Sequence, residues 1–74
     1  MERYGNLSGD SGVVGYEIRR GEIVVAFIND GKYRYTKASA GAHHIASMQR
    51  LARNGRGLST YISQEKPKYA ERWD

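Results

Sequence analysis

A few side chains of this 74-residue chain have the types and spacing of a serine nucleophile site. Gly9-Asp10-Ser11-Gly12 is typical of the segment around such a serine. The chemistry also needs a histidine base, an aspartate that orients it and an oxyanion hole, which a large scaffold brings together. Ser47 follows His43 by four residues, but no acidic residue occurs from Gly31 to Gln64 to orient the imidazole. We therefore attribute the tetrapeptide to chance, and we expect no catalytic residue and no enzyme.

The pair His43-His44 raises the question of a metal site. Adjacent residues of a helix diverge by about 100°. Zinc takes ligands four residues apart on a helix or from several elements. The chain has no cysteine, and no nearby carboxylate completes a ligand set. We expect no metal and no cofactor, with His44 at the edge of the core and His43 exposed.

A third candidate is Gly55-Arg56-Gly57, which precedes a predicted helix. It lacks the Gly-Lys-Ser/Thr ending and the preceding strand of a nucleotide-binding loop. Backbone N–H groups and the Arg56 guanidinium could still hold one phosphate there. The alternative, which we favour, is a flexible corner between two helices.

The net charge of +4 is unevenly distributed along the chain. Residues 1–31 carry three arginines against five acids, a balance of −2, whereas residues 32–74 carry nine Lys and Arg against three acids, a balance of +6. Such asymmetry indicates a polyanionic partner, although a basic face also serves solubility. The candidate nucleic-acid-binding residues within this basic part are Lys32, Arg34, His43, Arg50, Arg53 and Arg56.

These candidates fall into two groups. His43, Arg50 and Arg53 share the polar side of a predicted helix that runs toward Arg56, while Lys32 and Arg34 alternate with two tyrosines on a predicted strand. Arginine forks bind phosphate oxygens and aromatic rings stack on unpaired bases, so the combination is typical of RNA-binding proteins. If the helix packs on the tyrosine face, only the cations remain for a partner. Binding would then be weak, salt-sensitive and largely independent of sequence.

The elements that position these residues follow from the apolar pattern. Apolar side chains alternate from Val13, with Val14, Tyr16 and Ile18 expected on one face, and Arg20-Gly21 then provides a hairpin turn. Strands are predicted over about residues 22–28 and 32–37, separated by the hairpin signal Asp30-Gly31. Tight turns join all three strands, so they form an antiparallel meander.

Helices are predicted after the meander. Ser39 is the expected N-cap of an amphipathic helix over about residues 39–53, which packs on one face of the sheet and ends at Gly55. One or two short C-terminal helices follow, the first from about Ser59 and a last turn after Pro67. The prediction is an α+β fold with a mobile N-terminal tail over residues 1–11 and one domain over residues 12–74.

The composition limits the class of protein. A chain of this length holds one small core, and the lack of cysteine excludes disulfides and fits a cytoplasmic location. The longest apolar run has six residues, so we expect no membrane span. No basic segment followed by an apolar stretch opens the chain, so we expect no signal peptide.

The pattern from about Ser8 to Tyr69 resembles the KTSC domain, a family found at the C-terminus of some lysyl-tRNA synthetases and as free-standing small proteins. The resemblance rests on Gly15-Tyr16, the strand over 23–27, Asp30-Gly31, Tyr33-x-Tyr35, Ile62 and the segments 35–41 and 55–62. This chain departs from the family where Ser11 stands at an apolar position and Arg53 at a serine position. The resemblance implies the α+β fold above and, through the synthetase fusions, proximity to RNA. It implies no established activity.

We therefore expect a small non-catalytic binding module whose partner is nucleic acid, with RNA favoured. The alternative is a protein-interaction or self-association module without a nucleic-acid role. For this alternative, the exposed edge of the third strand and the aromatic residues Tyr61, Tyr69 and Trp73 would contact a partner chain. Neither interpretation includes a membrane or a small-molecule substrate.

Overall fold

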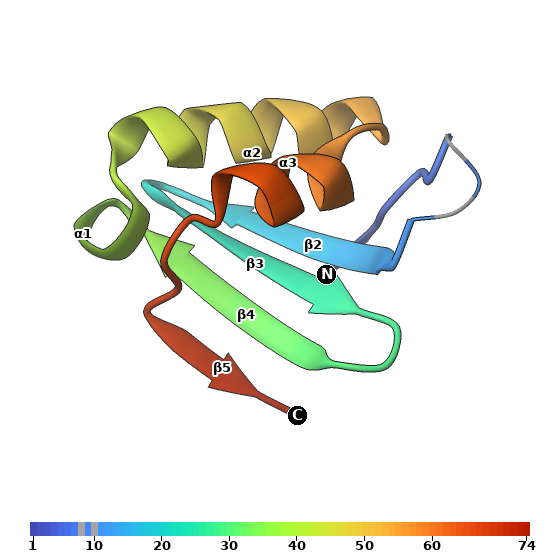
Figure 1. Ribbon diagram of the computed structural model, residues 1–74, viewed down its shortest axis with the longest axis horizontal. Coiled ribbons are helices and arrows are strands. Elements are labelled where there is room, and N and C mark those ends of the chain that lie inside the picture. Colours follow the sequence, from blue (N-terminus) through green and yellow to red (C-terminus); the bar gives the residue numbers. More distant parts are fainter. Residues whose placement is uncertain (8, 10) are drawn as a thin grey trace.

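The computed structural model describes residues 1–7, 9 and 11–74. These residues form an antiparallel sheet in the order β1-β2-β3-β4-β5, with α2 and α3 lying across one face (Figure 1). The bounds are β1 (Glu2–Arg3), β2 (Val13–Arg19), β3 (Glu22–Phe27), β4 (Gly31–Thr36), α1 (Lys37–Ala40), α2 (Ala42–Asn54), α3 (Leu58–Glu65) and β5 (Glu71–Trp73). The predicted α+β class is confirmed, and the predicted meander is the central part of a larger sheet.

Both predicted hairpin turns are present, and each depends on a glycine. Gly21 has a φ of +70° in the turn that pairs Arg19 with Glu22. Gly31 has a φ of +76° where β4 begins opposite Phe27. Glycine adopts such values without steric cost, so these turns fix the register of the three long strands.

The start of β2 differs from the expected alternation. The pairing register shifts between Val13 and Gly15, as in a β-bulge. Val13 is therefore only 1% exposed and joins Tyr16 and Ile18 on the helix-covered side, whereas Val14 is 43% exposed. The predicted grouping of Val14 with Tyr16 and Ile18 is wrong because a bulge inserts one residue and reverses the alternation beyond it.

The predicted helix over 39–53 is divided into α1 and α2. Thr36, not Ser39, caps α1: the Thr36 side chain accepts from the Ser39 N–H at 3.1 Å, and the Ser39 hydroxyl accepts from the Thr36 N–H at 3.0 Å. Gly41, with a φ of +92°, separates the two helices. The predicted end is confirmed, since Gly55 closes α2 in the left-handed conformation with a φ of +72°.

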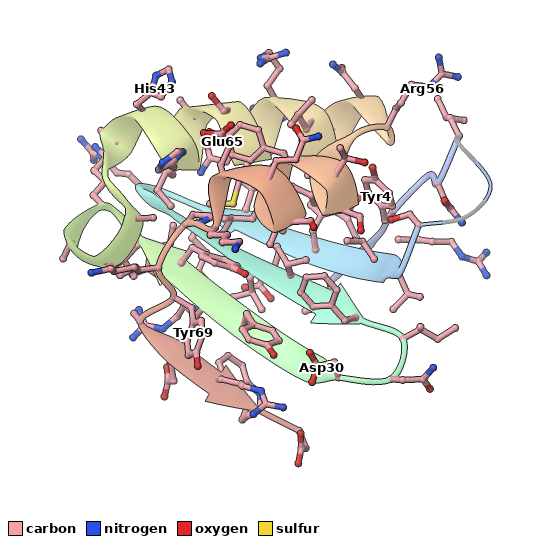
Figure 2. The ribbon with its side chains drawn as sticks, viewed as in Figure 1. Tyr4, Asp30, His43, Arg56, Glu65 and Tyr69 are labelled. Atoms are coloured by element: carbon pink, nitrogen blue, oxygen red, sulfur yellow. The ribbon has the colours of Figure 1, made fainter. Side chains whose placement is uncertain are left out.

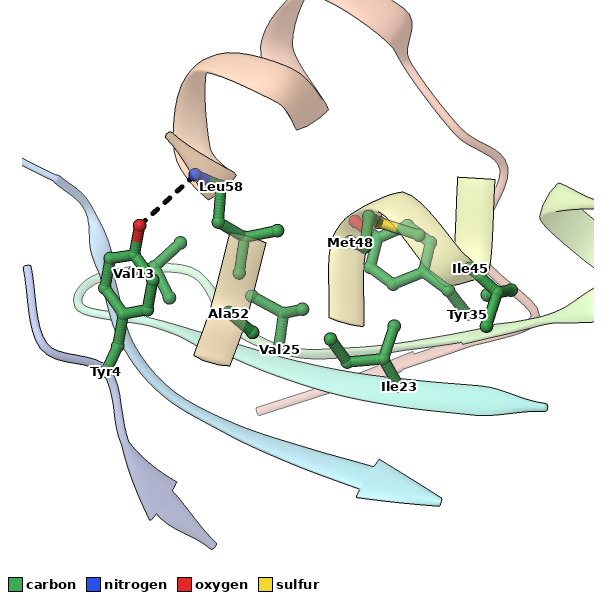
Figure 3. Packing of buried hydrophobic residues seen from close by; sticks show 9 residues of the cluster. All are labelled: Tyr4, Val13, Ile23, Val25, Tyr35, Ile45, Met48, Ala52 and Leu58. Carbon is green, nitrogen blue, oxygen red and sulfur yellow. Dashed lines mark hydrogen bonds between the residues drawn. The ribbon is translucent and has the colours of Figure 1, made fainter. Parts of the chain in front are cut away.

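The N-terminal segment is part of the fold. The prediction of a mobile tail over residues 1–11 is therefore wrong for residues 2–7. β1 pairs with β2, and the Tyr4 side chain is 4% exposed beneath α3. The Leu58 N–H donates to the Tyr4 hydroxyl at 3.2 Å (Figure 3), and the Leu7 N–H donates to the Gly55 carbonyl at 2.8 Å. A strand of two residues is too short to produce a periodic pattern. Residues 8 and 10 lie outside the described residues; both belong to the expected tail and to the KTSC resemblance, and residue 10 also belongs to the protease-like tetrapeptide.

The C-terminal residues form a strand where a helical turn was expected. β5 pairs with β4, matching Lys32 with Trp73 and Arg34 with Glu71. Tyr69 packs edge-on against Tyr33 with ring centroids 5.0 Å apart. The third strand of the meander is therefore not an exposed edge, which removes that part of the case for self-association.

The core lies between the sheet and the helices (Figure 3). Tyr35 is 2% exposed within it, and Tyr33 is half-buried at its margin. The helix thus packs on the tyrosine face, which is the case in which only the cations remain for a partner. The buried apolar residues of the cluster are Tyr4, Val13, Ile23, Val25, Tyr35, Ile45, Met48, Ala52 and Leu58. None of the helices in the described chain has both the length and the apolar character that crossing a membrane requires.

Candidate nucleic-acid interface

Helix α2 separates its apolar and basic side chains onto opposite faces. Ile45, Met48 and Ala52 are at most 2% exposed and point at the sheet. The 3.6-residue period then places His43 and Arg50 on the outer surface of the helix and Arg53 on its flank. We call the exposed side chains His43, Arg50, Arg53 and Arg56 the α2 cation row. Figure 2 shows its two ends, His43 and Arg56, pointing away from the sheet.

The three arginines of this row have no acidic partner among the residues that the structure describes. The ion pairs there join Arg19 to Glu17, Arg34 to Glu22 and Glu71, and Arg72 to Asp30. Arg53 shares an open hollow with Glu2 and Glu17, yet forms an ion pair with neither. Three arginines of the sheet (Arg19, Arg34 and Arg72) thus pair with nearby carboxylates, whereas the arginines of the α2 cation row form no ion pair with any residue that the structure describes.

The structure places Lys32 and Arg34 on the opposite side of the molecule. Their strand neighbours Tyr33 and Tyr35 face the helices, so the alternation of β4 turns both cations to the uncovered face of the sheet. The six predicted binding residues therefore do not form one surface. Four lie on the α2 cation row, and two lie across the sheet from it.

Arg34 is further distinguished by its partners. Its Nε atom donates to Glu71 at 2.9 Å and its Nη1 atom to Glu22 at 3.1 Å. The hydrogen bond to Glu71, supported by the charge of Glu22, raises the pKa of Arg34 above its ordinary value. A guanidinium that two carboxylates already bind is a poor ligand for phosphate, so Arg34 serves the sheet by joining β3, β4 and β5.

The corner at Gly55-Arg56-Gly57 is held by hydrogen bonds. Both glycines are left-handed, with φ values of +72° and +86°, and Gly55 accepts the Leu7 N–H. The first amide of α3, Leu58 N–H, is taken by Tyr4. The Leu58 amide is therefore not free to bind phosphate, whereas the Arg56 side chain is exposed.

The two histidines occupy the environments expected from the sequence. His43 is exposed, whereas His44 is half-buried with its Nδ1 atom 2.5 Å from the Tyr61 hydroxyl. Across the described part of the chain, no three His, Asp or Glu side chains gather in a way that would hold a metal ion. His44 thus joins α2 to α3 through Tyr61, and His43 is the histidine exposed on the surface.

The sequence did not reveal that the β2–β3 turn packs against α2. The Gln49 side-chain amide donates to the Arg19 carbonyl at 3.1 Å and to the Glu22 carbonyl at 2.9 Å. These contacts bring Arg20 of the turn close to the basic helix. Gln49 is about 30 residues from this turn in the sequence, and no periodic pattern predicts a contact over that separation. From the sequence, Arg20-Gly21 was predicted only to form a turn.

In comparisons with known proteins, no protein-family model, no curated protein and no solved structure matches this chain. These comparisons give no support to the predicted resemblance to the KTSC domain, which stays a prediction.

Proposed function

We propose that this protein is a non-catalytic binding module that holds nucleic acid, with RNA as the favoured partner, on the α2 cation row. The observation that supports this most is that Arg50, Arg53 and Arg56 are exposed and unpaired among the described residues. The KTSC resemblance, itself a proposal, adds an RNA context. A cytoplasmic location belongs to the same proposal and agrees with the absence of cysteine.

The proposed interaction is with the phosphate backbone. Guanidinium groups bind phosphate oxygens in a fork geometry, and each neutralised phosphate releases counterions. Three arginines that each contact one phosphate give a slope of log K against log salt of about −2.1 for single strands and about −2.7 for B-form duplex. Affinity then falls about 20- to 40-fold between 50 and 200 mM salt. Tyr35 is buried and Tyr33 half-buried away from this surface, so we assign no base stacking to either.

The test is a titration of labelled RNA at several salt concentrations. The variant Arg50→Gln/Arg53→Gln/Arg56→Gln is compared with Arg3→Gln/Lys32→Gln/Lys68→Gln, which removes the same charge from exposed positions outside α2 and its C-terminal corner. We expect the first variant to lose most of the salt slope and the control to keep it. Equal slopes in the two variants, or no binding by the wild type at 50 mM salt, would contradict the proposal.

Self-association is the second candidate, and exposed aromatic side chains favour it. Trp73 is 41% exposed on β5, and Tyr69 just before it is 50% exposed. β5 has only three residues and carries Glu71 and Arg72, features that disfavour pairing along the sheet edge, so contact would depend on the aromatic side chains. Light scattering over a range of concentrations distinguishes the candidates: a dimer that dissociates on Trp73→Ala supports self-association, and a monomer at all concentrations excludes it.

A further inference from the structure

Two further cations, Arg20 and Lys37, lie at the turn between β2 and β3. Arg20 lies in this turn and Lys37 begins α1, and both are exposed. The Lys37 N–H donates to the Gly21 carbonyl at 3.2 Å, and the Lys37 methylene groups lie against Gly21, where an added Cβ would be 3.3 Å from Lys37 Cε. The backbone thus holds two cations from separate elements at one turn.

The acidic residues beside this turn already have other partners. Arg19 binds the Glu17 carboxylate, and Arg34 binds the Glu22 carboxylate at 3.1 Å. Neither Arg20 nor Lys37 forms an ion pair with any residue that the structure describes. A phosphate group at this turn would therefore have two cationic side chains within one short stretch of structure, with no carboxylate among the described residues already bound to either.

The turn is also fixed next to the proposed interface. Gln49 binds the carbonyl groups of Arg19 and Glu22 on either side of the turn, and Arg50 follows Gln49 on α2. Figure 1 shows the turn below α2 and close to α1. A polyanion on α2 therefore has a second basic site within reach. This site lies beside α2 because the turn packs against the helix, although the two are far apart in the sequence.

We infer that Arg20 and Lys37 form a phosphate-contact site that extends the α2 cation row, so that a phosphodiester backbone passes from α2 onto the β2–β3 turn. The inference rests on the proposed function and adds to it a path for the nucleic acid. The two cations act as fixed positive charges that contact phosphate oxygens, and no covalent step is involved.

The first experiment measures the salt dependence of RNA binding by Arg20→Gln/Lys37→Gln. Its control is Arg3→Gln/Lys32→Gln, which removes the same charge from exposed residues on the sheet face away from the helices. Two lost phosphate contacts lower the magnitude of the slope by about 1.4 for single-stranded RNA. An unchanged slope in the control supports the site. If the two double variants behave alike while the α2 triple variant still loses binding, this inference is overturned and the proposed function stands.

The second experiment needs no RNA. Inorganic pyrophosphate is added to the wild-type protein, and the backbone amide signals are followed by NMR. We expect the signals of Gly21 and Lys37 to shift more than those of Arg3 and Lys32, and the shifts to be lost in Arg20→Gln/Lys37→Gln. Shifts of equal size at all four positions would overturn the site. If the wild type binds no RNA, the proposed function fails and this titration still decides whether the turn binds phosphate groups.

Discussion

Replacing Tyr4 by phenylalanine tests whether the N-terminal segment is part of the folded domain. The Tyr4 ring is 4% exposed, and its hydroxyl accepts the N–H of Leu58, the first residue of α3, at 3.2 Å. Phenylalanine keeps the ring and its packing but removes the acceptor. The Leu58 side chain is fully buried, so its amide has little access to water as a replacement.

The expected loss of stability in Tyr4→Phe follows from the Leu58 N–H, which would be left without an acceptor. Leaving a buried donor without a partner costs about 1–3 kcal/mol of the free energy of unfolding. In a domain of this size each kcal/mol lowers the melting temperature by about 4–8 °C. With a urea m-value of about 1 kcal/mol per M, the same loss moves the unfolding midpoint by about 1–3 M. Both values are within the reach of thermal and urea unfolding followed by circular dichroism.

Tyr69→Phe is the matched control. Tyr69 is 50% exposed, so we expect loss of its hydroxyl to change the free energy of unfolding by less than about 0.5 kcal/mol. If Tyr4→Phe is as stable as Tyr69→Phe, the segment from β1 to Tyr4 does not hold α3 in place. The N-terminal segment would then not be an integral part of the folded domain.

Further predictions concern β5 and the ionisable side chains. Gly31→Ala would place a Cβ atom 2.5 Å from the Trp73 carbonyl oxygen at a φ of +76°, so we expect a loss of about 1–3 kcal/mol in urea unfolding followed by Trp73 fluorescence. Burial raises the pKa of Tyr35 to about 12, so stability that is present below pH 10 is lost as the pH rises toward 12; Tyr35→Phe should flatten this alkaline decline. Hydrogen bonds from Tyr33 and then Arg72 hold the pKa of Asp30 below its ordinary value. Stability present above about pH 4 is therefore lost as the pH falls through that lowered pKa, and Asp30→Asn should reduce this acid dependence in urea titrations.

The parts of the fold that the sequence predicted correctly have strong local signals. Gly21 and Gly31 supply the positive φ of two turns, and Gly55 does the same at the end of α2. The amphipathic character of that helix was also predicted, and Ile45, Met48 and Ala52 form its buried side. Each feature is encoded within a few residues, so periodicity and turn chemistry suffice to predict it.

The features that sequence reasoning missed depend on contacts between distant residues. β1 and β5 have two and three residues, too few for a periodic pattern, and their pairing follows from the docking of Tyr4 and Tyr69. The bulge after Val13 changed which side chains face the core. A bulge leaves no clear mark in a run of valines and glycine, so the alternation gave the wrong face.

The candidate site was predicted only in part, because some of its features depend on local sequence and others on contacts between distant residues. The helical positions of Arg50 and Arg53 follow from the period of α2, so their common surface was predictable. The neutralisation of Arg34 by Glu22 and Glu71 depends on the pairing of three strands. Glu71 lies on a strand that was not predicted. Arg34 was therefore treated, from the sequence, as a cation available to nucleic acid.

The proposed function requires that nucleic acid contact the helix side of the molecule through Arg50, Arg53 and Arg56. An amide-shift titration of the wild-type protein with bulk tRNA tests it most directly, because one experiment reports both binding and its location. The account predicts shifts concentrated on α2 and the corner at Arg56, with smaller changes at Lys32 and Arg34 on the sheet face. Shifts centred on the sheet face, or no shifts at low salt, would contradict it.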